Sequence, residues 1–352
     1  MSTTLSLSPD AVAEIDISSQ VGETLGLAEH MRDALWRVES ADLRPQDSPG
    51  GLVVAGMGGS SIGGALARAA LGDRASRPIG LARDYALPSW TTTDTTVLCS
   101  SYSGNTEETL AAYEAAHALG ATTIVATAGG KLADLARADR VPVIPLPGGF
   151  QPRAAVGYSL VVALEVAALC GAGESLRSEV DVAAAHAELL AARWRPESGD
   201  DSLAKTLARA LHGTVPQIAG AGLTVPVAYR WKTQINENAK LPAFASELPE
   251  LDHNEIAGWD GARGLGSFSA VFLDDSDLHP RVRQRIELTR GLIASRGAAT
   301  FRVDTVGQTR LERLVSVLML GDLVSLYLAV LRGVDPAPVE TIDSLKAALD
   351  QG

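Results

Sequence analysis

The sequence predicts an α/β fold of two three-layer αβα domains, each with a parallel β-sheet between helices. Two observations carry this prediction. Short apolar segments alternate with helical segments along the chain, and this alternation restarts after a polar stretch near the middle. Strands that alternate with helices are typical of a parallel sheet covered on both faces. At 352 residues and 46% apolar composition, the chain can fill more than one hydrophobic core.

The first domain begins its alternation at residue 52. An apolar strand, a glycine-rich turn at Gly56–Gly59 and a helix follow one another, which is the start of a βαβ unit. Further strands and helices continue the pattern. The predicted strands span residues 52–55, 96–100, 122–126 and 141–145. One predicted helix follows the glycine-rich turn and ends at residue 71, a second ends at residue 119, and three more cover 132–138, 159–171 and 180–194.

The polar stretch Arg195–Ser202 is the best linker in the chain, so we expect domains at residues 1–194 and 195–352. After it the alternation restarts, which suggests an internal duplication. The predicted strands of the second domain are 214–219, 269–273 and 299–303, with a glycine turn at 220–222 and helices at 225–240, 281–295 and 311–331. Residues 241–259 are expected to form a long irregular connection.

Small hydroxyl residues follow two strands of the first domain, where helix N-termini present free N–H groups to an anion. The second domain lacks such residues at the equivalent turns, 220–223 and 274–277. We therefore expect one phosphate-binding cradle per chain. Its predicted members are Gly58, Gly59, Ser60, Ser101, Ser103 and Thr106.

These segments also have other interpretations. Ser and Thr before a helix are commonly N-caps, but two such segments on adjacent βα units favour a binding function. In G-M-G-G-S-S, Ser61 stands where a dinucleotide-binding fingerprint needs its third glycine, and the chain has no Walker A motif. A Rossmann dehydrogenase is possible but disfavoured.

Four ionisable residues could move protons or stabilise charge around a sugar phosphate: Glu237, His253, Arg153 and Lys346. Each also has a structural interpretation, such as a solvated helix residue or an ion pair. Asp252, His253, Asn254 and Glu255 stand together in the expected irregular connection, and long connections in compact domains are often functional.

Composition excludes several other classes. The formal net charge is −12, which disfavours nucleic acid and anionic membranes as partners. The apolar runs 159–170 and 314–331 are interrupted by Glu165 and Asp322, so we expect helices buried in a soluble protein. Cys99 and Cys170 are expected to be reduced and buried in a cytoplasmic protein. The six histidines form no paired ligand motif, so no metal and no cofactor are expected.

Five motifs resemble the bifunctional phosphoglucose/phosphomannose isomerase family of double sugar-isomerase (SIS) domain proteins, and the likeness runs in order from about residue 50 to the C-terminus. They are G-M-G-G-S-S-I-G-G (Gly56–Gly64), S-Y-S-G-N-T-E-E-T (Ser101–Thr109), P-R-A-A-V-G-Y-S (Pro152–Ser159), W-K-T-Q-I-N-E-N-A-K (Trp231–Lys240) and L-D-H-N-E-I-A-G-W (Leu251–Trp259).

The resemblance implies two SIS domains of flavodoxin-like topology and the interconversion of fructose 6-phosphate with glucose 6-phosphate and mannose 6-phosphate. It assigns the phosphate to the cradle, the base to Glu237 and enediolate stabilisation to Arg153. It assigns ring opening to His253 and Lys346. It also implies a homodimer with shared active sites, in which the histidine comes from the partner subunit.

Two rival functions remain open. The first is a non-catalytic sugar-phosphate sensor that keeps the cradle; the retained ionisable residues argue against it, and no DNA-binding domain is visible. The second is an amino-sugar or pentose-phosphate isomerase on the same scaffold.

Overall fold

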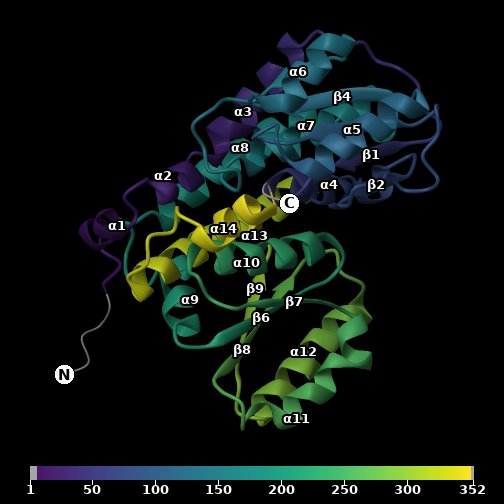
Figure 1. The fold of residues 1–352 in the computed structure, drawn as a ribbon. Coiled ribbons are helices and arrows are strands. Elements are labelled where there is room, and N and C mark those ends of the chain that lie inside the picture. Colours follow the sequence, from purple (N-terminus) through teal and green to yellow (C-terminus); the bar gives the residue numbers. More distant parts are fainter. Residues whose placement is uncertain (1–5, 350–352) are drawn as a thin grey trace.

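The computed structural model describes residues 6–349 and contains two parallel β-sheets flanked by helices (Figure 1). The strands of the first sheet are β1 (Leu52–Ala55), β2 (Ile79–Ala82), β3 (Thr96–Ser100), β4 (Thr122–Thr127) and β5 (Val143–Pro145). Those of the second are β6 (Val215–Gly220), β7 (Phe244–Glu247), β8 (Phe268–Asp274) and β9 (Ala299–Asp304). The predicted α/β fold with parallel sheets is confirmed.

Helices cover both faces of the first sheet. The helices of the first part of the chain are α1 (Pro9–Ile15), α2 (Gln20–Leu25), α3 (Leu27–Ser40), α4 (Gly58–Leu71), α5 (Glu107–Leu119), α6 (Gly130–Asp139), α7 (Val156–Leu169) and α8 (Arg177–Trp194), with a 3-10 turn η1 (Gly72–Arg74). Helices α3 to α7 contact the strands of the first sheet, α8 contacts α3, and α1 and α2 contact α13. Helices α4 to α8 correspond to predicted helices, whereas α1 to α3 and the strand β2 were not predicted from the sequence.

The second part of the chain holds α9 (Leu203–Leu211), α10 (Val225–Asn238), α11 (Trp259–Ala262), α12 (Pro280–Ser295), α13 (Arg310–Arg332) and α14 (Glu340–Leu349). Three 3-10 turns are η2 (Gly222–Thr224), η3 (Glu250–His253) and η4 (Glu255–Gly258). The expectation of a long irregular connection at 241–259 was wrong, because β7, η3 and η4 occupy most of it. The segments α9 and α11 were also not anticipated.

The two sheets share one topology. The strand order is β2-β1-β3-β4-β5 in the first and β7-β6-β8-β9 in the second. The first matches the flavodoxin-like order 2-1-3-4-5, and the second repeats it without the last strand. In both sheets the neighbouring strands pair in parallel, so their carboxyl ends meet at one edge. Ligands of open α/β sheets bind at that edge.

Helix α13 lies at the centre of the molecule, with every residue from Leu311 to Leu331 buried. It contacts α2 and α8 from the first part of the chain and α9 and α10 from the second. By length and composition it could cross a membrane, but its apolar window is 100% buried inside the protein. This confirms the predicted core helix. The expected boundary at residues 194 and 195 stays a prediction.

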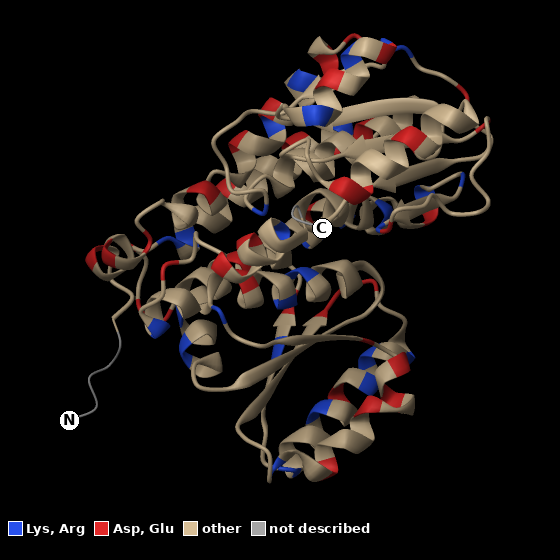
Figure 2. Cartoon of the chain, viewed as in Figure 1, with Lys and Arg blue, Asp and Glu red and all other residues tan. Residues whose placement is uncertain are grey.

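Cys99 and Cys170 are free thiols and are buried, as expected. Ionisable residues are dispersed: Figure 2 shows Lys and Arg interspersed with Asp and Glu over helices of both parts of the chain.

Candidate active site

The first cradle segment is the N-terminus of α4, directly after β1. Gly58 adopts φ +51°, a left-handed conformation that L side chains rarely adopt. Gly59 lies against the backbone of Pro152, because a Cβ added to it would stand 2.6 Å from the Pro152 carbonyl oxygen. The close approach places the start of α4, with its unpaired N–H groups, directly beside the segment that carries Arg153.

The second cradle segment follows β3. The Ser101 and Thr106 hydroxyl oxygens lie 2.9 Å apart, and Ser101 Oγ accepts a hydrogen bond from the Gly104 N–H at 3.1 Å. The Tyr102 N–H donates to Ser60 Oγ at 3.2 Å, which ties the two segments together. Ser101 is buried, whereas Ser103 is exposed. The structure therefore brings the predicted hydroxyl groups to one sheet edge.

Arg153 and Glu237 meet although 84 residues separate them: Nη1 of the arginine lies 3.4 Å from Oε2 of the glutamate. Arg153 stands just before α7, and Glu237 stands in the last turn of α10. The Glu237 side chain is 29% exposed and that of Arg153 is 6% exposed. A half-buried carboxylate held by a buried guanidinium is a suitable arrangement for proton transfer beside a developing negative charge.

The remaining donors of Arg153 hold other parts of the chain. Nε donates to Asn238 Oδ1 at 2.7 Å, and Nη2 donates to the carbonyl oxygens of Pro336 and Ala337 at 2.6 and 2.9 Å. Lys240 Nζ donates to the same Pro336 carbonyl at 3.0 Å and to the Glu237 carbonyl at 2.7 Å. These hydrogen bonds hold the segment 335–337, which leads into α14, against the candidate site.

Burial dominates the electrostatics of the two cations. Burial lowers the pKa of the Arg153 guanidinium, and the Glu237 carboxylate acts in the opposite direction. Burial likewise lowers the pKa of Lys240, with the positive charge of Arg153 contributing in the same sense. Asn238 and Lys240 were not among the predicted site residues. Their adjacency to Glu237 in N-E-N-A-K was the available signal.

His253 and Lys346 are not brought to Arg153 and Glu237 by side-chain contacts. Within residues 6–349, neither side chain makes a hydrogen bond or an ion pair, and both residues are exposed. His253 ends η3, and its neighbour Asp252 instead accepts from Arg285 and Thr289. Lys346 lies on α14, which has no buried residue. Their roles stay predictions.

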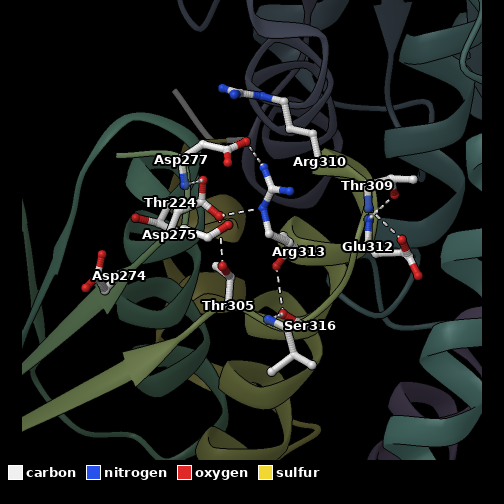
Figure 3. A network of polar contacts seen from close by, with 12 residues as sticks. Thr224, Asp274, Asp275, Asp277, Thr305, Thr309, Arg310, Glu312, Arg313 and Ser316 are labelled. Carbon is white, nitrogen blue, oxygen red and sulfur yellow. Dashed lines mark hydrogen bonds and ion pairs between the residues drawn. The ribbon is translucent and has the colours of Figure 1, made fainter. Parts of the chain in front are cut away.

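The second sheet carries acids where the first carries the cradle. Asp275 directly follows β8, the counterpart of β3, and binds Arg313 Nε at 2.8 Å and the Thr305 hydroxyl at 2.7 Å (Figure 3). Asp277 also pairs with Arg313. Carboxylates at this edge would repel a phosphate, and the Arg313 guanidinium is already engaged by both of them. These contacts agree with a single cradle per chain.

A metal centre is not evident in the described part of the chain: residues 6–349 contain no group of three or more His, Cys, Asp or Glu side chains that could hold an ion. The metal-free mechanism stays a prediction.

Comparisons with known proteins bear on this site. Residues 200–349 match the family described as the bacterial phospho-glucose isomerase C-terminal SIS domain. A bifunctional phosphoglucose/phosphomannose isomerase of Caldicellulosiruptor bescii is 42% identical over 301 residues, which is 85% of this chain and 89% of that protein. The chain belongs to the bifunctional phosphoglucose/phosphomannose isomerase family. The Aquifex aeolicus member is 35% identical over 89% of this chain and 94% of its own length.

Solved structures support the fold of this family member. A hypothetical protein from Thermus thermophilus superposes with a TM-score of 0.73 at 14% identity, covering 95% of this chain and 90% of its own. A glucosamine-6-phosphate deaminase from Thermotoga maritima gives a TM-score of 0.64 at 15% identity, covering 91% and 97%. At such identities the likeness concerns the fold alone. It confirms the SIS-type architecture expected from the motifs.

Proposed function

We propose that this isomerase-family protein interconverts fructose 6-phosphate with glucose 6-phosphate and mannose 6-phosphate, by metal-free proton transfer through an enediolate. The observation that carries the proposal is the 3.4 Å approach of Arg153 Nη1 to Glu237 Oε2, beside the start of α4. The curated relatives named above bear both activities in their names.

The cradle would bind the phosphate through hydroxyl and backbone N–H donors. Ser60, Ser101, Ser103 and Thr106 supply the hydroxyls, and Gly58 and Gly59 allow the backbone to approach. Neutral donors suit an anion in a protein with a net charge of −12, because they need no compensating acid nearby. The bound phosphate would then fix the distance from the sugar carbons to Glu237.

Glu237 would move the proton between C1 and C2. As the ionised carboxylate it removes the proton next to the carbonyl, and as the acid it returns that proton to the neighbouring carbon. Arg153 would stabilise the negative charge that develops on the enediolate oxygen, where low solvent access strengthens the interaction. Asn238 orients Arg153 through its 2.7 Å hydrogen bond.

His253 and Lys346 would assist ring opening. The exposure of His253 and its lack of contact with its own Glu237 support delivery from the partner subunit of a homodimer. Lys346 would reach the site through the 335–337 segment that Arg153 and Lys240 hold. We further propose that the protein acts in the cytoplasm, consistent with its buried thiols.

An amino-sugar phosphate is a second candidate substrate. A D-glucosamine-6-phosphate 4-epimerase of Sulfolobus acidocaldarius is 35% identical over 172 residues, which is 48% of this chain and 53% of that protein. The shorter coverage makes this the weaker candidate, but glucosamine 6-phosphate belongs in the substrate panel.

The test is turnover by purified protein in the presence of a chelator. Fructose 6-phosphate is supplied, and glucose 6-phosphate and mannose 6-phosphate are quantified separately, with glucosamine 6-phosphate assayed in parallel. Formation of both hexose phosphates is expected. Binding of fructose 6-phosphate without turnover would overturn the proposal and favour the sensor; loss of activity with chelator and recovery with a divalent metal would overturn the metal-free mechanism.

A further inference from the structure

A cavity of about 370 Å³ lies between the two parts of the chain, apart from the candidate active site. Its walls come from α4 and the end of β2 on one side, and from η2, the start of α10 and the end of β7 on the other. It is lined by Ile62, Ala65, Arg68, Ala69, Leu81, Arg83, Gly222, Val225, Pro226, Tyr229 and Glu247. The volume falls in the range of small-molecule sites.

The cavity and the candidate active site use different faces of the same helices. On α4, Gly59 and Gly63 pack against the segments of Pro152 and Ser159, whereas Ile62, Ala65 and Ala69 face the cavity. On α10, the cavity touches Tyr229, which is 237 − 229 = 8 residues before Glu237. At 1.5 Å per residue this separates the two by about 12 Å along the helix.

Two arginines give the cavity its positive charge. Neither Arg68 nor Arg83 has a carboxylate partner among residues 6–349. Arg83 is positioned by neutral groups: its Nε donates to Ser61 Oγ, and its guanidinium carbon lies 5.5 Å from the Tyr229 ring centroid. A guanidinium offers a planar fork of donors that matches a phosphate or carboxylate. The two arginines outnumber the one carboxylate of the lining, Glu247, so the net charge of the cavity is positive and favours an anion.

The other lining residues indicate which further chemical groups a ligand of this cavity would carry. Glu247 has no hydrogen-bond or ion-pair partner in the described part of the chain, and its carboxylate can accept hydrogen bonds from hydroxyl groups. The Tyr229 ring and the side chains of Ile62 and Leu81 offer apolar surface to C–H groups. We propose that this cavity is a second binding site, for the phosphate monoester of a sugar or sugar alcohol.

A ligand bound in the cavity would contact both parts of the chain. Arg68 and Arg83 belong to the first part of the chain, and Tyr229 and Glu247 to the second. A ligand that contacts both would link α4 to α10, the helix that carries Glu237 at its other end. Binding therefore stabilises the folded protein and fixes the position of α10 relative to the cradle.

The experiment is titration calorimetry of the full chain with sorbitol 6-phosphate, which has no carbonyl group and cannot be isomerised. Two saturable sites per chain are expected in the wild-type protein. Arg68→Gln should weaken one site at least tenfold and leave turnover unchanged, since Arg68 is exposed and outside the candidate active site. Arg193→Gln, an exposed arginine on α8, is the matched control and should retain both sites.

Two further variants separate the parts of the proposal. Ser101→Ala combined with Thr106→Ala should remove the other site, in the cradle. Glu247→Gln should weaken sorbitol 6-phosphate at the second site but not inorganic phosphate, because only the polyol needs the carboxylate. The proposal is overturned by a single site in the wild-type protein, or by two sites that persist when Arg68 and Arg83 are both replaced by Gln. Circular dichroism of each variant verifies its folding, and the assay requires no catalytic turnover.

Discussion

Arg153 Nη1 and Glu237 Oε2 approach to 3.4 Å across the junction between the two parts of the chain. The arginine also donates to Asn238, the residue after Glu237, so its guanidinium spans the end of α10. The Arg153 side chain therefore contacts Glu237, the proposed base, and the residue that follows it. A change in the relative position of α7 and α10 would alter their geometry directly.

Glu237→Gln should lower kcat by roughly a hundredfold or more, since it removes the proton acceptor but keeps the side-chain size. Binding of glucose 6-phosphate, measured by calorimetry, should stay within a few-fold of wild type. Glu114→Gln on the exposed face of α5 is the control and should change neither quantity. A parallel loss of binding and activity would identify Glu237 as a structural residue instead.

Arg153→Lys should lower kcat/KM and also loosen the C-terminus. A lysine has one ammonium group and cannot reproduce the bonds to Asn238, Pro336 and Ala337 together. Hydrogen exchange of residues 334–349 should therefore accelerate. Arg137→Lys, at an exposed ion pair on α6, should leave that exchange at the wild-type rate. Unchanged protection in Arg153→Lys would contradict the anchoring role.

Ser103→Cys should create a reactive thiol that a sugar phosphate protects. The two native cysteines should not react with the thiol reagent, because Cys99 and Cys170 are buried and burial raises the pKa of Cys99 to about 12. Ser103 is exposed in the cradle, so its replacement should react with a thiol reagent, and saturating glucose 6-phosphate should slow the reaction several-fold. Ser178→Cys on α8 should react without protection. Equal protection of both thiols would exclude a local effect.

A shared active site predicts complementation between two inactive variants. In a heterodimer of Glu237→Gln and His253→Ala subunits, one of the two sites contains a native glutamate and the partner's native His253. Statistical exchange should restore about a quarter of wild-type activity. Each homodimer alone is the control. Absence of recovery after verified exchange would place the functional histidine in the same subunit as Glu237.

Gly321→Ala should destabilise the fold strongly. A Cβ at this position of α13 would stand 2.0 Å from Trp231 Nε1, which is itself bound to the Val317 carbonyl. Overpacking of this kind should lower the free energy of unfolding by roughly 2–3 kcal/mol in urea denaturation. Gly291→Ala on exposed α12 has no neighbour within 4 Å and should raise it by about 0.5–1 kcal/mol. Similar effects at the two sites would refute the packing argument.

The central strands and the edge strands β5 and β9 could be predicted from the sequence, whereas the edge strands β2 and β7 could not. The residues of β1 and β3 are buried throughout and mostly apolar, so their segments stand out. By contrast β2 and β7 lie at sheet edges, are partly exposed and have the sequences I-G-L-A and F-A-S-E, which give no clear pattern. Helix α3 could have been found, since its buried Leu27, Met31, Ala34 and Val38 have helical spacing.

Some parts of the candidate site could likewise be predicted from the sequence, and others could not. The cradle was predictable because hydroxyl residues follow two strands that must end at one edge. The contact of Arg153 with Glu237 was implied only by resemblance. The hydrogen bonds of Arg153 and Lys240 to the Pro336 carbonyl could not be predicted from the sequence. Every residue carries a backbone carbonyl, so residue type does not indicate which carbonyl will lie near a given side chain in the folded protein.

The central position of α13 has a consequence for synthesis of the protein. Residues 310–332 fill the space against α2 and α8, which are made long before them. During translation the first part of the chain therefore emerges before α13 exists to cover α2 and α8. These faces of α2 and α8 stay exposed until nearly the whole polypeptide has been synthesised. Translation that stops before residue 310 yields a product with exposed apolar surface, which is a substrate for chaperones and proteases.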